Sequence, residues 1–460
     1  MPTSGSVGTV RLGATADYRP TRTDSAAPKP RPFDWGYGVN MVANAGTTSQ
    51  LILQEAYVKG RFHQIELYAG RRRNIIGLMD TTLSSGAYAW SGNALPIPVI
   101  QIGTIGYAPV KFTRGLIAIN AIFNHGWFTD GFVQNSYLHQ KTLYGRLGKP
   151  NWRVKLYGGI SHQVQWSGYA PGLGNDPGLS ENGYLASGVG SYVNVITSRR
   201  GASAYTTNPG VISVDQGNRI GNQLGSVDVA IEFNVSAYNV MIYRQNPYET
   251  GALYYLTSIA DGLNGIRLQR KQPGTSRFSV DHILFEYFYS KSQGGPEFVI
   301  EDPKRRGQTN NFNHSQYQDG WTYLGRTIGT PFLSQRTEVR PNLVSSTIAN
   351  NRVSLVHVAA AGSVNQRIAW LLKLSYSQNF GTYPSPYPAD INQFSGLVQV
   401  ATPVSIPTLG ECQLNASLAL DRGQLLYNSA GVYIGLRKTI TSQPVDRQRD
   451  PTTGSRMLRQ

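Results

Sequence analysis

Three consecutive arginines and four aromatic residues are the side chains of this sequence best suited to bind a ligand. The arginines end a stretch of alternating apolar and polar residues, and they are Arg71, Arg72 and Arg73. A guanidinium group pairs with a carboxylate or phosphate through two parallel hydrogen bonds. The aromatic residues lie in or beside long polar segments, and they are Trp90, Trp127, Trp321 and Tyr323. Flat rings stack on sugar faces, so we expect these seven residues to bind an acidic polysaccharide. Packing within loops and anchoring at a membrane interface are alternative roles for the aromatic residues.

Residues typical of catalysis or metal binding are not arranged in a recognisable motif. The seven histidines are scattered without HxxxH or HExxH spacing, so we expect no metal site. No Gly-x-Ser-x-Gly sequence is present, and Cys412 lies among leucines on an apolar strand face. Glu297, Glu301 and Asp302 stand beside a basic run at 304–306. A glycosidase needs two carboxylates on either side of a sugar ring, whereas this spacing favours a solvated, salt-bridged loop. The sequence therefore predicts a protein that is not an enzyme and that has no cofactor.

The composition limits the class of protein. The chain has 460 residues, a formal net charge of +16, 50 glycines, 25 prolines and a single cysteine. One cysteine excludes a disulfide framework. The positive charge suggests an acidic partner, either polysaccharide or the anionic surface of a membrane. No helix-turn-helix, zinc-finger or RNA-binding aromatic motif is present, so we expect no nucleic-acid partner.

Alternation of apolar and polar residues is the main structural signal. In the stretch 51–62, Val58 and Phe62 fall on one side of an extended strand, and Lys59 and Arg61 fall on the other. Similar alternation predicts strands near 10–18, 33–46, 65–73, 115–128, 152–160, 227–235, 238–248, 278–289, 367–377, 412–421 and 432–437. Roughly sixteen to eighteen strands of about ten residues fit the chain, which is the length that crosses a bilayer at a tilt. The sequence therefore predicts an all-β fold, a large antiparallel transmembrane β-barrel.

The connections are expected to be short at one end of the barrel and long at the other. Tight turns are predicted near His63, near Ser236 and at 364–366, and long loops at 78–112, 129–151, 168–224, 294–350 and 381–392. This asymmetry is typical of outer-membrane barrels. Segments 138–147 and 185–196 are predicted to be short helices inside loops. We expect one barrel domain over residues 1–440, followed by a polar tail at 441–460.

Three long motifs resemble the capsule assembly Wzi family of outer-membrane proteins. They are the run Leu53 to Tyr57 with Ala69 to Arg71, the run Ser84 to Asn93 with Pro96 to Pro98 and Asn124 to Phe128, and the run Gly320 to Phe332. The resemblance implies an eighteen-stranded outer-membrane barrel that attaches or organises capsular polysaccharide or exopolysaccharide as a lectin-like binder. Outer-membrane lipid or lipopolysaccharide is a second expected partner.

Three alternatives remain open at this level. They are a porin-like or polysaccharide-export channel, a polysaccharide-modifying barrel, and a soluble all-β protein. The third is considered because residues 1–8 lack the basic and apolar regions of an export signal. A start site upstream of Met1 would also explain this feature, and we expect location in the outer membrane. The sequence sets neither the sugar nor the oligomeric state.

Overall fold

The computed structural model describes residues 5–18, 32–199, 219–249, 255–299 and 302–441. In these ranges, eighteen strands form one antiparallel sheet. Its first strands are β1 (Val7–Ala16), β2 (Phe33–Gly46), β3 (Gln50–Phe62), β4 (Ile65–Arg71), β5 (Val99–Thr104), β6 (Ala108–Pro109), β7 (Ile117–Trp127), β8 (Tyr137–Leu147) and β9 (Val154–Trp166). The others are β10 (Asn222–Val235), β11 (Tyr238–Glu249), β12 (Gly262–Arg270), β13 (Phe278–Tyr289), β18 (Val353–Val364), β19 (Ile368–Gly381), β20 (Pro386–Ile406), β21 (Gly410–Gly423) and β22 (Ser429–Arg437).

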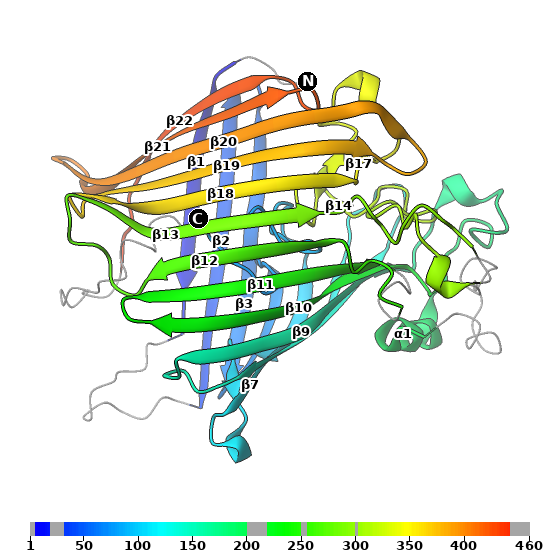
Figure 1. The fold of residues 1–460 in the computed structure, drawn as a ribbon, viewed down its shortest axis with the longest axis horizontal. Helices are drawn as coiled ribbons and strands as arrows, with labels where there is room; N and C mark the ends of the chain where they lie inside the picture. Colours follow the sequence, from blue (N-terminus) through cyan, green and yellow to red (C-terminus); the bar gives the residue numbers. More distant parts are fainter. Residues whose placement is uncertain (1–4, 19–31, 200–218, 250–254, 300–301, 442–460) are drawn as a thin grey trace.

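Strands that follow one another in the chain are neighbours in the sheet. β6 continues β5 along β7, and β13 pairs directly with β18. The sheet curves back on itself, so that β1, β2 and β3 cross behind β9 to β20 (Figure 1). Among the described residues no ladder joins β1 to β22, which are the two edges of the sheet. The predicted all-β barrel fold is confirmed, and we call the concave side of the sheet its lumen.

The two faces of the wall differ as the alternation predicts. Outward side chains are apolar and exposed: Val58 is 61% exposed, Leu67 56% and Ile266 50%. Inward side chains of the wall strands are polar and paired, as in the ion pairs of Arg61 with Asp34 and of Lys155 with Glu232. An apolar exterior with a polar interior is the pattern of a barrel that contacts lipid.

Connections at one end of the barrel are short, as predicted. The turns at His63, Ser236 and Asn365-Gln366 have positive φ values of 53°, 45°, 51° and 54°. This backbone twist suits a tight connection between antiparallel strands. The opposite end, on the right of Figure 1, has long connections and also holds α1 (Gly188–Thr197). We call it the long-loop end.

The smaller elements belong to the connections. They are the 3₁₀ helices η1 (Lys111–Thr113), η2 (Pro171–Leu173), η4 (Pro303–Arg305) and η5 (Pro341–Leu343), and the short strands β14 (Thr322–Tyr323), β15 (Arg326–Thr327), β16 (Ser334–Gln335) and β17 (Ile348–Asn350). No helix in the described ranges is long and apolar enough to cross a membrane.

Helix α1 lies against the outside of the barrel. Its Tyr192 stacks on Trp166 of β9, with ring centroids 5.1 Å apart and an angle of 17° between the planes. The same ring contacts His125 of β7 and His139 of β8 at 5.6 and 5.7 Å. These histidines share their strand faces with Phe123 and Leu143, which are exposed on the exterior. The helix therefore covers a polar part of the outer wall. The predicted helix at 185–196 is confirmed in position.

Several predicted boundaries are wrong. Segment 138–147 was expected to be a helix but is strand β8, because its outward His139 and Lys141 lie under α1 and its inward Leu138 packs in the lumen. Both faces of β8 therefore mix polar and apolar residues. The predicted loops 78–112 and 129–151 contain β5 and β8, and β20 begins inside the predicted loop 381–392. Apart from residue 441, the predicted tail lies outside the described residues.

Candidate functional site

Residues 72–98, which connect β4 to β5, fold into the lumen, and we call them the inner segment. Most of its side chains are buried, and Leu83, Ala87 and Tyr88 are 0% exposed. They pack in the same hydrophobic cluster as Tyr243 and Phe288, which project from the opposite wall. The chain between two adjacent strands of one wall therefore fills the interior instead of lying above the barrel.

Glu286 of β13 is the centre of the polar contacts that hold the inner segment. Its carboxylate accepts hydrogen bonds from Ser84 Oγ at 2.6 Å and from both the backbone nitrogen and the hydroxyl of Ser85 at 2.7 Å. Tyr243 of β11 donates a further bond of 2.5 Å. Glu286 is 0% exposed, so these four donors replace the water that a carboxylate would otherwise require.

Other wall strands bind the same segment. Asp228 of β10 accepts from the backbone nitrogen of Leu78 at 2.9 Å, and His357 of β18 contacts the carbonyl oxygen of Leu83 at 2.8 Å. Glu249 at the end of β11 accepts from the hydroxyl of Tyr88 at 2.9 Å. Contacts to β10, β11, β13 and β18 fix the inner segment across the lumen.

Asp80 fixes the fold of the inner segment itself. One of its oxygens accepts from the backbone nitrogens of Thr82 and Leu83 at 2.9 and 2.6 Å. The other oxygen lies 2.8 Å from His282 Nε2 on β13. Burial opposes ionisation of this carboxyl, but the contacts with His282 and with the backbone of Leu83 outweigh it and lower the pKa of Asp80 to about 2. Asp80 is therefore ionised at neutral pH and acts as an anchor.

Residues 302–350 cover the inner segment at the long-loop end, and we call them the outer layer. Trp321 Nε1 donates to the carbonyl oxygen of Ala89 at 2.8 Å, and Ser91 Oγ donates to Gly329 at 2.6 Å. Phe312 packs on Tyr88, with centroids 5.1 Å apart. Its backbone nitrogen also donates to Glu249, at 2.9 Å. The inner segment and the outer layer are thus joined through backbone and side chains.

The predicted aromatic site residues come together in part. The ring centroid of Trp321 is 6.2 Å from Trp90 and 6.3 Å from Phe128, and Phe128 is 6.0 Å from Tyr323. Trp90 is 9% exposed, Trp321 0% and Tyr323 3%, so their faces are occupied by protein. Trp127 lies apart from this cluster. It is 41% exposed and shares the outward face of β7 with Phe123.

The three arginines have separate surroundings. Arg71 Nε donates to the carbonyl oxygen of Pro96 at 2.9 Å, and its guanidinium lies 6.0 Å from the ring of Tyr323. Arg72 forms an ion pair of 2.6 Å with Glu66 and lies over the ring of Tyr68 at 4.1 Å. Arg73 has an exposed side chain. Only Arg73 combines the predicted charge with free access to solvent.

A polar cavity of about 450 Å³ lies beside the inner segment, towards the short-turn end of the lumen. Arg72 and Glu66 line it together with amide and phenol groups, which include Asn74, Gln101, Asn120, Tyr107 and Tyr157. The rings of Tyr107 and Tyr157 meet edge to face at 5.4 Å. Burial and the nearby Asp228 raise the pKa of Tyr107 to about 12, so its hydroxyl remains a donor. Such groups bind hydroxylated ligands.

Apart from Arg72, none of the residues that line this cavity was among the predicted site residues, because nothing in the sequence shows that residues 66, 107 and 157 share one cavity.

Comparison with solved structures finds β-barrels of outer membranes. The chain is similar to Wzi of Escherichia coli, described as an outer membrane protein involved in group 1 capsule assembly and a carbohydrate-binding β-barrel. The TM-score is 0.57 with 13% identity, over 95% of this chain and 84% of that chain. OccK10 (OpdN) of Pseudomonas aeruginosa gives a TM-score of 0.41 with 10% identity, over 95% of this chain and 99% of that chain.

BamA of Haemophilus ducreyi, lacking its POTRA domains 1–3, gives a TM-score of 0.36 with 9% identity, over 94% of this chain and 70% of that chain. No family model and no curated protein matches the sequence. Of these three structures, Wzi has a TM-score above 0.5, and the structural argument rests on it. The chain therefore has a Wzi-like β-barrel fold.

Proposed function

We propose that this protein is an outer-membrane barrel that binds a cell-surface polysaccharide and acts in the assembly or attachment of capsule or exopolysaccharide. The observation that carries the proposal is the filled lumen. Five buried contacts hold residues of the inner segment to β10, β11, β13 and β18, and the outer layer covers it. A barrel that is filled by its own chain suits binding at the surface better than passage through a pore.

The Wzi-like fold supports the same proposal, because the solved Wzi barrel is described as carbohydrate-binding and as involved in capsule assembly. The exposed Arg73 is the arginine that we propose for contacts with acidic sugar groups. Trp90, Trp321 and Tyr323 act indirectly, by holding the outer layer on the inner segment. Trp127 lies on the exterior and is proposed as an anchor at the membrane interface.

The test is direct binding of polysaccharide to the purified barrel. Calorimetric titration with polysaccharide from the surface of the producing cells should give saturable binding that falls when Arg73 is changed to Ala. Arg270→Ala, at the short-turn end, is a matched control with an expected affinity close to that of the wild type. If the wild-type barrel binds no polysaccharide, the proposed function is wrong. If it binds equally after Arg73→Ala, the assigned residue is wrong.

A further inference from the structure

Three cationic side chains lie on the barrel wall near the long-loop end, between β11 and β19. Arg244 of β11 shares the outward face of that strand with Ile242, which is 43% exposed. Lys291 follows β13, and its Nζ lies 3.6 Å from the ring centroid of Phe380. Arg352 precedes β18, and its guanidinium lies 3.9 Å from the ring of Tyr383. The wall therefore carries a belt of cations and aromatic rings above its apolar surface.

No carboxylate pairs directly with these cations in the described part of the chain. Arg244 donates to the amide oxygens of Asn246 and Asn264 at 2.7 and 2.6 Å and to the carbonyl oxygen of Ile259 at 2.5 Å. These are neutral acceptors. Arg352 Nε donates to the carbonyl oxygen of Lys291 at 3.0 Å. The belt thus has positive charge without a bound counter-charge.

Asp261 is the acid that interacts electrostatically with both arginines, but it is directed elsewhere. Its two oxygens accept from the backbone nitrogens of Ser292 and Gln293, at 3.0 and 2.7 Å. Burial raises the pKa of this carboxyl to about 6, and Arg244 and Arg352 oppose that rise. Arg244 also donates to the backbone carbonyl oxygen of Asp261 at 3.2 Å, and Arg352 donates to that of Lys291, next to Ser292, so the two arginines lie in the same neighbourhood. One carboxylate beside three cations leaves an excess of two positive charges in this region.

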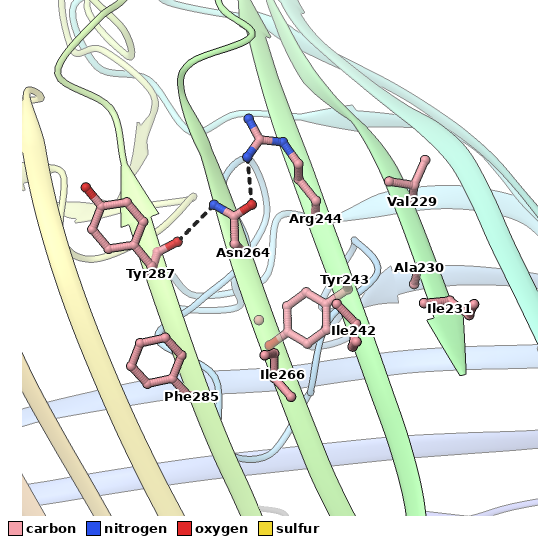
Figure 2. Close-up of a pocket in the computed structure, with 11 residues that line it drawn as sticks. Val229, Ala230, Ile231, Ile242, Tyr243, Arg244, Asn264, Ile266, Phe285 and Tyr287 are labelled. Carbon is pink, nitrogen blue, oxygen red and sulfur yellow. Dashed lines mark hydrogen bonds between the residues drawn. The ribbon is translucent and has the colours of Figure 1, made fainter. Parts of the chain in front are cut away.

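An apolar groove of about 440 Å³ extends from Arg244 towards the middle of the wall. Arg244, Asn264 and Tyr287 lie at one end, and Ile242, Ile266 and Phe285 lie at the other (Figure 2). Phe285 is 47% exposed and Ile266 50%, so the groove opens to the exterior. A cationic end followed by an apolar channel matches a molecule with an anionic head and a hydrocarbon chain.

We propose that this groove and the belt bind a phosphorylated glycolipid of the outer leaflet, with one acyl chain in the groove and the phosphates at Arg244, Lys291 and Arg352. Three separated cations fit a head group that carries more than one phosphate, and arginine pairs with phosphate through two hydrogen bonds. Aromatic rings are typical of the level at which a barrel meets the head groups, and Phe380 and Tyr383 lie beside these cations. The inference rests on the membrane location in the proposed function and is independent of polysaccharide binding.

Native mass spectrometry of the detergent-purified barrel tests the site with bisphosphorylated lipid A as the probe. We expect the wild type to retain this lipid and to retain dephosphorylated lipid A about tenfold less well, as expected for lost charge-assisted bonds. Equal retention of the two lipids would overturn the proposal without any mutation. If phosphatidylglycerol is retained as well as bisphosphorylated lipid A, the site binds anionic lipids in general and not a glycolipid. If the protein forms a dimer that excludes lipid, the groove is the contact surface for a second copy of the chain. Either result overturns the proposal.

Variants locate the lipid on the barrel. Lys291→Gln combined with Arg352→Gln should reduce retention of bisphosphorylated lipid A by about tenfold, and Arg244→Gln should reduce it similarly. Arg270→Gln is the matched control, because Arg270 lies 5.7 Å from the ring of Tyr238 at the opposite end of the same wall. Lys291→Gln tests the site even if Arg244→Gln fails to fold, since Lys291 Nζ lies over the ring of Phe380 and its loss leaves the hydrogen bonds of the wall intact. Unchanged retention in the folded cation variants would contradict the site, as would an equal loss in Arg270→Gln. Polysaccharide titration of the same preparations separates this failure from failure of the proposed function.

Discussion

The two faces of the wall between β10 and β19 use charge in opposite ways. On the lumen face, Asp228, Glu249 and Glu286 are buried, and each accepts hydrogen bonds from the inner segment. On the outer face and at its rim, Arg244, Lys291 and Arg352 have neutral or aromatic partners. The lumen carboxylates bind the inner segment, whereas the outer cations form no direct ion pair with a carboxylate in the described part of the chain. The difference indicates that the inner face maintains the fold and that the outer face is available to a partner.

Loss of the carboxylate at Glu286 should have the largest effect on stability. Glu286→Ala removes an acceptor of four hydrogen bonds and leaves the Ser85 nitrogen and the hydroxyls of Ser84, Ser85 and Tyr243 without it. We expect the free energy of unfolding to fall by about 4 kcal/mol. The temperature at which the folded form loses its SDS-resistant mobility on a gel measures the change. Glu297→Ala, in an exposed ion pair with Arg305, should leave that temperature almost unchanged. Equal shifts in the two variants would show that Glu286 does not anchor the inner segment.

A buried tryptophan and an exposed tryptophan are expected to differ in their contribution to stability. Trp321→Ala removes a fully buried indole and its bond to Ala89, and we expect a loss of about 3 kcal/mol. Trp127→Ala changes a side chain that is 41% exposed, and we expect a change within about 0.5 kcal/mol. Melting of both variants in detergent checks the difference. A Trp321→Ala protein with wild-type stability and a selective loss of polysaccharide binding would instead favour the stacking role predicted from sequence.

The buried carboxyl group of Asp261 is expected to make the stability of the fold depend on pH. Burial raises the pKa of Asp261 to about 6 from an ordinary value of 3.8, so the folded chain holds this proton more tightly than the unfolded chain. The resulting stabilisation is complete below about pH 4 and is lost as the pH rises through about 6. Asp261→Asn should lack this component.

The check is the difference in melting temperature between the wild type and Asp261→Asn at pH 4, 6 and 8. We expect the wild type to lose stability relative to the variant as the pH rises over this range. A difference that stays constant with pH would show that Asp261 is not held in its protonated form by burial.

The outer belt is expected to contribute little to stability. Lys291→Gln removes a charge that lies over the ring of Phe380, and we expect the free energy of unfolding to change by no more than about 1 kcal/mol. The melting temperature in lipid-free detergent should stay near the wild-type value, while retention of phosphorylated lipid falls. A large loss of stability without lipid would place Lys291 in the structural framework and would weaken the contrast between the two faces.

The barrel was predictable because the environment of its strands alternates. Outward Val58 and Val229 contact the exterior, and inward Lys59 and Asp228 face the lumen, so the period of two is preserved in the sequence. The alternation of apolar and polar residues did not identify strands whose outer face is covered by protein or whose length is short. Strand β8 has α1 over its outer face, and β5 is only six residues long.

The candidate site was predictable only in outline. The motifs lie in the inner segment and the outer layer, and Trp90, Trp321 and Tyr323 lie in one cluster. Their burial could not be inferred, because it depends on a loop folding into the lumen. The bond between Ser85 and Glu286 joins residues 201 positions apart, and no local pattern encodes such a contact.

Single-channel conductance in planar bilayers tests the filled lumen most directly. The wild-type barrel should give no steady conductance steps, and a variant with residues 74–96 replaced by a short Gly-Ser linker should give steps of uniform size. Folding of both proteins is checked beforehand by their change in gel mobility on boiling. Steady, uniform steps from the wild type would contradict the account, because an open path would favour a channel over a polysaccharide-binding protein.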